Sequence, residues 1–209
     1  MSLSVLSHDG WDELVLSIQA DPRETATEAL LRAISVLHRQ GADLLRATVY
    51  CRVTPSGSPL TGPRGVPVTF VEGAPCGDGL VAGVHAIGAR GAPVAYYEAE
   101  HGAMASVVED GHGRWAYVTN VTPTALWAPP AMQARETFER AEAVLKLAGM
   151  TFRNVYRTWL YLNDLLGWYG ELNRVRTAFY RERGVFEGTV PASTGIGAAN
   201  PTGAALTLD

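Results

Sequence analysis

The chain has 209 residues, of which 47% are hydrophobic and 18% charged, and its formal net charge at pH 7 is −4. This composition allows a folded core and excludes global disorder, and the acidic balance disfavours nucleic-acid binding, which needs a basic surface. No apolar run approaches the roughly 18 residues that cross a bilayer, and residues 1–13 lack both parts of a secretory signal. The two cysteines, Cys51 and Cys76, form neither a CxxC pair nor a zinc cluster. We therefore expect a reduced, cytoplasmic protein with no membrane and no nucleic-acid partner.

The first half of the chain predicts one helix and three strands. The helix is expected from about Arg23 to Gln40, with Asp21 as its N-cap and Gly41 beyond its end. Its apolar residues follow helical spacing. The strands are β-branched and flank a loop rich in proline, glycine and serine. They are expected at Leu45–Val53, then, after the loop Thr54–Gly65, at Val66–Val71 and Leu80–Ile87.

The second half begins the pattern again. The expected elements are strands at Val94–Glu98, Met104–Glu109 and Trp115–Val121, a helix at Ala131–Ala148, a strand at Val155–Leu162, a helix at Trp168–Arg183 and a strand pair within Ala192–Asp209.

The two halves of the chain contain similar segments, which are offset from each other by a fixed number of residues in each case. A spacing of 111 residues places Arg46 on Arg157, and a spacing of 124 places Pro67 on Pro191. The first copy has its loop where the second copy has a second helix. We therefore predict an α+β fold of two tandem modules, the first degenerate, over residues 1–90 and 91–209.

Five segments of the second copy, in order, resemble the RidA/YjgF family. They are GRWAYVTNVTP at 111–123, KLAG at 146–149, VYRTWLYLND at 155–164, ELNRVRTAFY at 171–180 and VPASTGIG at 190–197. The resemblance covers about residues 94–209 and, weakly, 14–88. It implies a chorismate-mutase-like module with a mixed sheet and helices packed on one face, assembly around a threefold axis, and active sites in clefts between modules. It also implies hydrolysis of enamines and imines, in which an arginine holds the substrate carboxylate and a glutamate assists water.

The sequence departs from that family at the residues that carry the activity. Ser193 stands where the arginine is expected and Thr207 where the glutamate is expected, and the first copy has Thr69 and Gly83 at these positions. Asn173 is kept on the second helix. The usual imine deaminase pair is therefore missing from both copies.

A second branch fits these changes better. Residues 157–161 (RTWLY) and 191–197 (PASTGIG) resemble the chorismatases, which are fused RidA-like modules that hydrolyse the enolpyruvyl ether of chorismate. We expect a small-molecule enzyme acting by hydrolysis or proton transfer on a carboxylated enol ether or imine, in bacterial secondary metabolism. The alternative is a non-catalytic binding or scaffold subunit that completes an oligomeric ring with an active partner.

The candidate binding residues lie on two strands and one helix. Alternation puts Arg157, Trp159 and Tyr161 on one strand face, where an arginine between aromatic rings can hold a planar carboxylated ligand. The competing interpretation is a surface arginine stacked on Trp159. Small polar residues near the end of the chain offer hydroxyls and backbone N–H groups, although they also suit a plain strand entrance. The full set of candidate binding residues is Arg157, Trp159, Tyr161, Asn173, Ser193, Thr194 and Gly195.

Two carboxylates are candidates for moving the proton. They are Glu72, close to Cys76 in the first copy, and Asp209, on the last strand. The competing interpretation of Glu72 is a solvated strand end. His85 is expected to be structural, and the EAEH segment at 98–101 lacks a third metal ligand. We predict no metal and no cofactor, a small carboxylated metabolite as the ligand, and a homotrimer or a hetero-oligomer with a related module.

Overall fold

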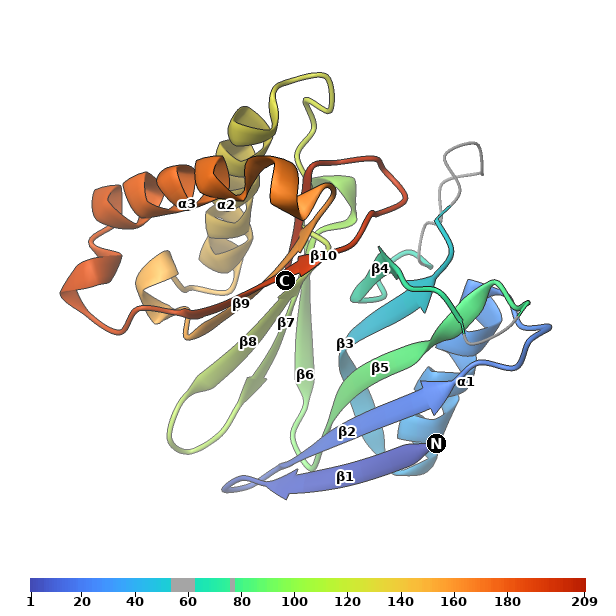
Figure 1. Ribbon diagram of the computed structural model, residues 1–209. Helices are drawn as coiled ribbons and strands as arrows, with labels where there is room; N and C mark the ends of the chain where they lie inside the picture. The colour runs from blue at the N-terminus through green and yellow to red at the C-terminus, as the bar shows by residue number, and fades with distance from the viewer. Residues whose placement is uncertain (54–62, 76–77) are drawn as a thin grey trace.

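The computed structural model describes residues 1–53, 63–75 and 78–209. The fold is α+β, as expected, and its two modules pack against each other (Figure 1). Module 1 contains a five-stranded mixed sheet in the order β1-β2-β5-β3-β4. Its elements are β1 (Ser2–Ser7), β2 (Asp12–Gln19), α1 (Ala26–Arg39), β3 (Ala42–Cys51), β4 (Val68–Glu72) and β5 (Val81–Arg90).

Helix α1 begins at a different cap from the one the sequence suggested. Thr25, not Asp21, is the N-cap: its hydroxyl accepts a hydrogen bond from the Glu28 N–H, and the Glu28 carboxylate accepts one from the Thr25 N–H. Asp21 instead closes a turn by accepting from the Arg23 N–H. The capping box satisfies two backbone N–H groups at once, which explains why the helix starts here.

Module 2 is built from two three-stranded sheets and two long helices. Its sheets have the orders β6-β7-β8 and β10-β9-β11, and a single bridge joins Val121 to Leu208. Its elements are β6 (Val94–Glu98), β7 (Met104–Glu109), β8 (Arg114–Thr119), α2 (Pro130–Leu147), β9 (Arg157–Leu162), α3 (Leu165–Glu182), β10 (Ala192–Gly197) and β11 (Leu206–Leu208), with short 3-10 turns at Glu100–Gly102, Phe152–Asn154 and Val185–Glu187.

The strand order repeats between the modules. In module 1, β3 pairs parallel with β4 and antiparallel with β5; in module 2, β9 pairs parallel with β10 and antiparallel with β11. Helix α1 then corresponds to α2, and no helix that would correspond to α3 lies among the described residues between β3 and β4. The expectation of two tandem modules, the first degenerate, is confirmed by this order.

Two details of the expected strands are wrong. The hairpin β1–β2 at the N-terminus was missed, because its mixture of serine and apolar residues gives a weak local signal. The two strands of the C-terminal segment do not pair with each other, since β9 lies between them. A register set by non-local pairing cannot be read from local alternation.

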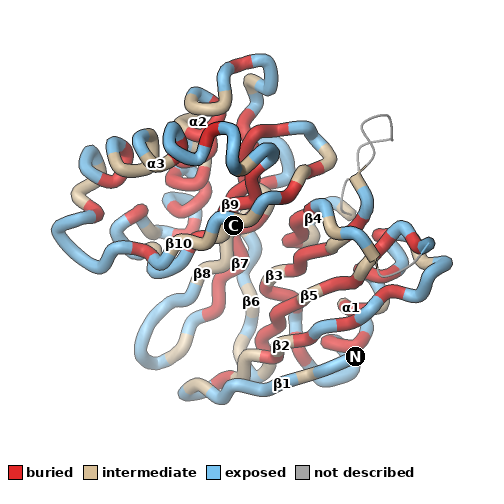
Figure 2. The backbone as a smooth tube through the Cα atoms, viewed as in Figure 1, coloured by how far each residue is buried: buried red, intermediate tan, exposed pale blue. Residues whose placement is uncertain are grey.

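The sheet of module 1 faces the two sheets of module 2, and the helices lie outside (Figures 1 and 2). Helix α1 covers the outer face of its sheet, and α2 and α3 cover that of module 2. Between the sheets, Val71 packs with Tyr161 and Ala198, while Leu45 packs with Val108. No helix among the described residues is long and apolar enough to span a membrane.

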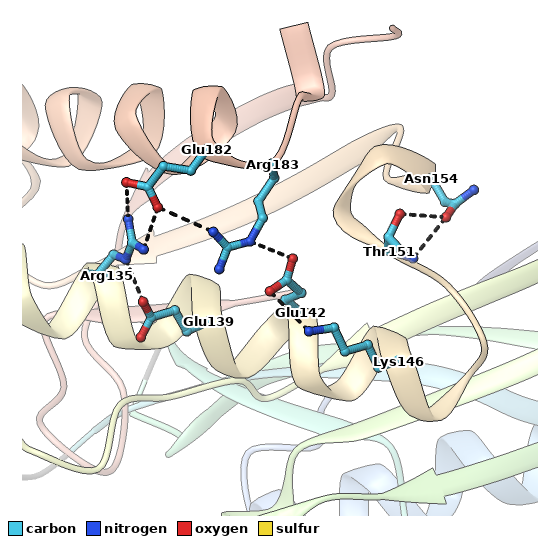
Figure 3. A network of polar contacts seen from close by, with 8 residues as sticks. All are labelled: Arg135, Glu139, Glu142, Lys146, Thr151, Asn154, Glu182 and Arg183. Atoms are coloured by element: carbon cyan, nitrogen blue, oxygen red, sulfur yellow. Dashed lines mark hydrogen bonds and ion pairs between the residues drawn. The ribbon is translucent and has the colours of Figure 1, made fainter. Parts of the chain in front are cut away.

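Charged side chains hold α2 and α3 together (Figure 3). The Arg183 Nε donates to the Glu142 carboxylate at 2.8 Å, and the two Nη groups of Arg135 donate to Glu182 at 2.9 and 2.6 Å. Both guanidinium groups also lie over the ring of Phe179. Because Glu142 is nearly buried, its ion pair is screened less than the exposed ones.

Candidate functional site

A cleft of about 240 Å³ lies between the facing sheets, and we call it the intermodular cleft. Module 1 contributes side chains from β2, β3 and β5, and module 2 contributes β8, β9 and the end of β11. Seven of its lining residues have polar side chains: Glu13, Arg46, Tyr117, Tyr156, Arg157, Trp159 and Asp209.

Asp209 is the buried acid of this cleft. Its Oδ1 accepts a hydrogen bond from the Thr69 hydroxyl at 2.6 Å and another from the Asn120 N–H at 3.0 Å. Its Oδ2 lies 4.0 Å from the Arg46 Nη1, and the side chain is only 1% exposed. Burial raises the pKa of this carboxyl above its ordinary value, although Arg46 and the two hydrogen bonds oppose the rise. The arrangement suits a carboxylic acid that holds a proton.

Two arginines from different modules face the cleft. Arg46 lies on β3 and is mostly buried, whereas Arg157 lies on β9 and is exposed. The Arg157 guanidinium lies 4.2 Å from the centre of the Trp159 ring, and its Nη2 donates to the Thr194 hydroxyl at 3.4 Å. Stacking on an indole keeps a guanidinium flat and leaves its edge free to form a fork with a carboxylate.

Two buried polar atoms at the intermodular cleft have no hydrogen-bond partner in the described part of the chain. Among the described residues, Arg46 Nε and Asp209 Oδ2 are buried and have no hydrogen-bond partner. Buried atoms of this kind are rare in folded proteins, since each costs its desolvation energy. The cleft therefore has two polar atoms, Arg46 Nε and Asp209 Oδ2, whose hydrogen-bonding capacity is not used by the fold.

The surroundings of the cleft keep other groups neutral. Burial raises the pKa of Tyr117, and the neighbouring Glu13 raises it further. Burial also raises the pKa of Tyr156. On β5, burial and then the charge of Arg46 lower the pKa of His85. These groups stay uncharged at neutral pH, so the positive charge of the cleft comes from its arginines.

The expected binding residues divide between two faces of the module 2 sheet. Arg157, Trp159 and Thr194 share the face toward module 1. Ser193 and Gly195 lie on the other face: Ser193 accepts a hydrogen bond from the Thr158 hydroxyl at 2.8 Å, and Gly195 lies beneath α3.

This division corrects one expected equivalence. Thr48 pairs with Thr69 in module 1, whereas its counterpart Trp159 pairs with Thr194 in module 2. Thr69 therefore corresponds to Thr194 and not to Ser193. A shift of one residue along a strand reverses the face of every side chain, which is why Ser193 points away from the cleft.

The remaining candidates lie outside the cleft. Tyr161 is buried in the interface, where it packs with Val71. Asn173 is on α3 and accepts a hydrogen bond from Arg176 at 2.9 Å. Glu72 is exposed at the end of β4, where its carboxylate accepts from the Ala199 N–H at 3.2 Å. Cys76, which the sequence put beside Glu72, lies outside the described residues.

Four of the polar cleft residues were not among the sequence candidates: Glu13, Arg46, Tyr117 and Tyr156. The repeat contained a signal for Arg46, because it falls on Arg157 in the 111-residue spacing. Nothing local indicated the two tyrosines. No group of three metal-ligating side chains occurs in residues 1–53, 63–75 and 78–209.

Comparisons with solved structures include a match over nearly the whole chain. Neither a protein-family model nor a curated protein matches the sequence. A solved chorismatase matches 99% of this chain and 75% of its own, with a TM-score of 0.63 at 13% identity. The YjgF gene product of E. coli matches 53% of this chain and 80% of its own, with a TM-score of 0.40 at 18% identity. Yeast Mmf1 matches 56% of this chain and 87% of its own, with a TM-score of 0.41 at 18% identity.

Proposed function

We propose that this chain, which has the fold of a chorismatase, is a small-molecule enzyme that acts on a carboxylated enol ether or imine in the intermodular cleft. The observation that carries the proposal is the buried Asp209 carboxyl, whose pKa is raised, beside two arginines from different modules. The arginines supply the binding energy for a carboxylate, and the acid supplies a proton.

Each residue has a distinct role in this proposal. Arg157 holds a substrate carboxylate by its free edge, with Trp159 behind it as a flat support. Arg46 supplies the second positive charge from the opposite sheet. Asp209, in its protonated form, gives its proton to the double bond of an enol ether or to the nitrogen of an imine. Water then attacks the resulting cation and returns a proton to Asp209, and the hemiketal or carbinolamine that forms breaks down with release of the alcohol or amine. Glu72 has no part in this scheme, because it lies outside the cleft lining.

Turnover of chorismate and of simple 2-imino acids, followed by product release, tests this proposal. Asp209→Asn keeps the Oδ1 acceptor but removes the acidic proton, so we expect kcat to fall about 100-fold or more. Since only the protonated acid is active, wild-type activity is expected to decrease as pH rises through the pKa of Asp209.

Two arginine variants separate binding from chemistry. Arg157→Ala is expected to weaken ligand affinity about tenfold or more, and Arg157→Lys to restore only part of it, because an ammonium cannot form a fork. Arg174→Ala is the matched control: Arg174 is exposed on α3 and pairs only with Glu171 among the described residues. Equal affinity in Arg157→Ala and Arg174→Ala would contradict the proposal.

A scaffold role is the second candidate, and one observation favours it. Asp209 and Asn120 of module 2 both hydrogen-bond Thr69 of module 1, so the same cluster fastens the modules together. In that case Asp209→Asn lowers stability, and neither chorismate nor an imine is consumed by the wild type. Light scattering then tests the expected homotrimer or hetero-oligomer.

A further inference from the structure

Glu13 is an acidic residue that module 1 contributes to the intermodular cleft, and the proposed function gives it no role. It lies on β2, whose Leu14, Leu16 and Ile18 pack in the core beneath α1. Because side chains alternate along a strand, Glu13 faces module 2. Its side chain is only 16% exposed. Most of the water that would solvate this carboxylate is therefore excluded.

The fold supplies this carboxylate with polar neighbours but with no fixed positive charge. Among the described residues, its ion-pair contact is with the His8 Nε2 at 3.3 Å, and no arginine or lysine pairs with it. Tyr117 lies beside it, since burial raises the pKa of Tyr117 and Glu13 raises it further. A neutral imidazole and a phenol offer hydrogen bonds without charge, and a mostly buried carboxylate without a counter-charge is costly. Glu13 is therefore suited to pair with a cation that comes from outside the chain.

Positive and negative charge lie apart on the module 1 side of the cleft. Arg46 is on β3 and Glu13 is on β2, and β5 lies between these two strands. Within that sheet, Ile87 pairs with Arg46 and Ala89 pairs with Glu13. The backbones of β2 and β3 are thus two strand spacings, about 10 Å, apart. A ligand that contacts both groups has its opposite charges at its two ends and not on neighbouring atoms.

We propose that Glu13 determines specificity in the intermodular cleft, which takes a substrate with a carboxylate at one end and an ammonium group at the other. Arg46 and Arg157 hold the carboxylate, and Glu13 pairs with the ammonium group. Tyr117 and Tyr156 also line the cleft, and a tyrosine ring beside a cation adds to its binding. This inference rests on the proposed function, because the ligand occupies the same cleft. It narrows the carboxylated substrate to one that carries an amino group far from its carboxylate.

Two ligands of nearly the same shape test the role of Glu13. They are trans-4-(aminomethyl)cyclohexanecarboxylate and trans-4-ethylcyclohexanecarboxylate, which end in an ammonium and a methyl group, respectively. Isothermal titration calorimetry measures their affinities at pH 8, where an ordinary imidazole is uncharged and an aliphatic ammonium group keeps its charge. Glu13→Gln removes the charge and keeps the shape of the side chain. Glu171→Gln is the matched control, because Glu171 is exposed on α3 and pairs with Arg174.

We expect the wild type and Glu171→Gln to bind the amino ligand about tenfold more tightly than the ethyl ligand, because a desolvated charge pair adds at least this much. Glu13→Gln is expected to bind the two ligands about equally. A preference that persists in Glu13→Gln would overturn the proposal. Equal affinities in the wild type would overturn it too, and this comparison does not depend on how a variant folds.

Turnover separates this inference from the proposed function. If the wild type consumes chorismate but binds the two ligands equally, the inference is wrong and the proposed function stands. If a preference that depends on Glu13 is found in a chain that consumes neither an enol ether nor an imine, the cleft binds such ligands and the proposed function is wrong. Arg157→Ala is expected to weaken both ligands alike, since they share the carboxylate that Arg157 holds.

Discussion

The hydrogen bond between Thr69 and Asp209 connects the modules at the cleft, and its removal gives the sharpest test of the structure. Thr69 is fully buried on β4, and its hydroxyl donates to Asp209 Oδ1 at 2.6 Å while accepting from the Asn120 N–H at 2.9 Å. Thr69→Val replaces this hydroxyl by a methyl group of nearly the same size. Both residues are β-branched, so strand propensity hardly changes.

The expected loss follows from two opposing effects. Removing the Thr69 hydroxyl takes one hydrogen-bond partner from each of two buried groups, which costs about 1–3 kcal/mol, and burying one more methyl group returns about 0.8 kcal/mol. We expect Thr69→Val to lower the free energy of unfolding by about 1–2 kcal/mol. For a chain of this length, that corresponds to a decrease in Tm of roughly 2–8 °C.

Thr119→Val is the matched control. Thr119 is also fully buried on a strand, but its hydroxyl has no hydrogen-bond partner among the described residues. The same substitution there removes an unsatisfied polar group, so we expect unchanged or increased stability, by about 1 kcal/mol. Urea unfolding followed by tryptophan fluorescence measures both. If the two variants lose the same stability, the Thr69–Asp209 hydrogen bond is not formed in solution.

Thr69→Val also tests the proposed role of Asp209 as the proton donor. The hydroxyl of Thr69 lowers the pKa of Asp209 against the dominant effect of burial. Its loss therefore raises that pKa further, and the acid stays protonated to higher pH. We expect the alkaline limb of the activity profile to move upward in Thr69→Val and to stay in place in Thr119→Val.

Three further predictions concern the fold around the site. Thr25→Ala removes the observed cap of α1 and is expected to cost about 1 kcal/mol, whereas Asp21→Ala, at the cap position suggested by the sequence, costs less; chemical unfolding of the two variants compares them. Burial raises the pKa of Glu142, but its ion pairs with Arg183 and Lys146 together lower it overall. Glu142→Gln is therefore expected to cost about 1.5 kcal/mol in the same assay, with less cost at high salt. Hydrogen bonds, the largest contribution coming from the His112 N–H, lower the pKa of Asp110 to about 2. The stability that this carboxylate contributes is therefore complete at pH values above its ordinary pKa of 3.8 and is lost as pH falls toward 2. Asp110→Asn should flatten this part of the acid-unfolding curve.

The sequence by itself determined the α+β class, the tandem repeat and most of the elements within it. Helical periodicity and β-branched runs located α1, α2 and α3 and most strands to within a few residues, because these signals depend on neighbours along the chain. Alternation correctly put Arg157 and Trp159 on one face, since the period of a strand is two. The repeat offset of 111 residues also makes Arg46 and Arg157 equivalent positions of the two modules, and both line the intermodular cleft.

Only the tertiary structure decided which residues meet in the cleft. Arg46 and Asp209 are 163 positions apart and come together because the two sheets pack face to face. The register of β10 against β9 put Thr194 on the cleft face and Ser193 on the helix face, and a one-residue difference was enough to exchange them. Pairing register and burial are set by contacts between distant segments, so local sequence patterns do not contain them.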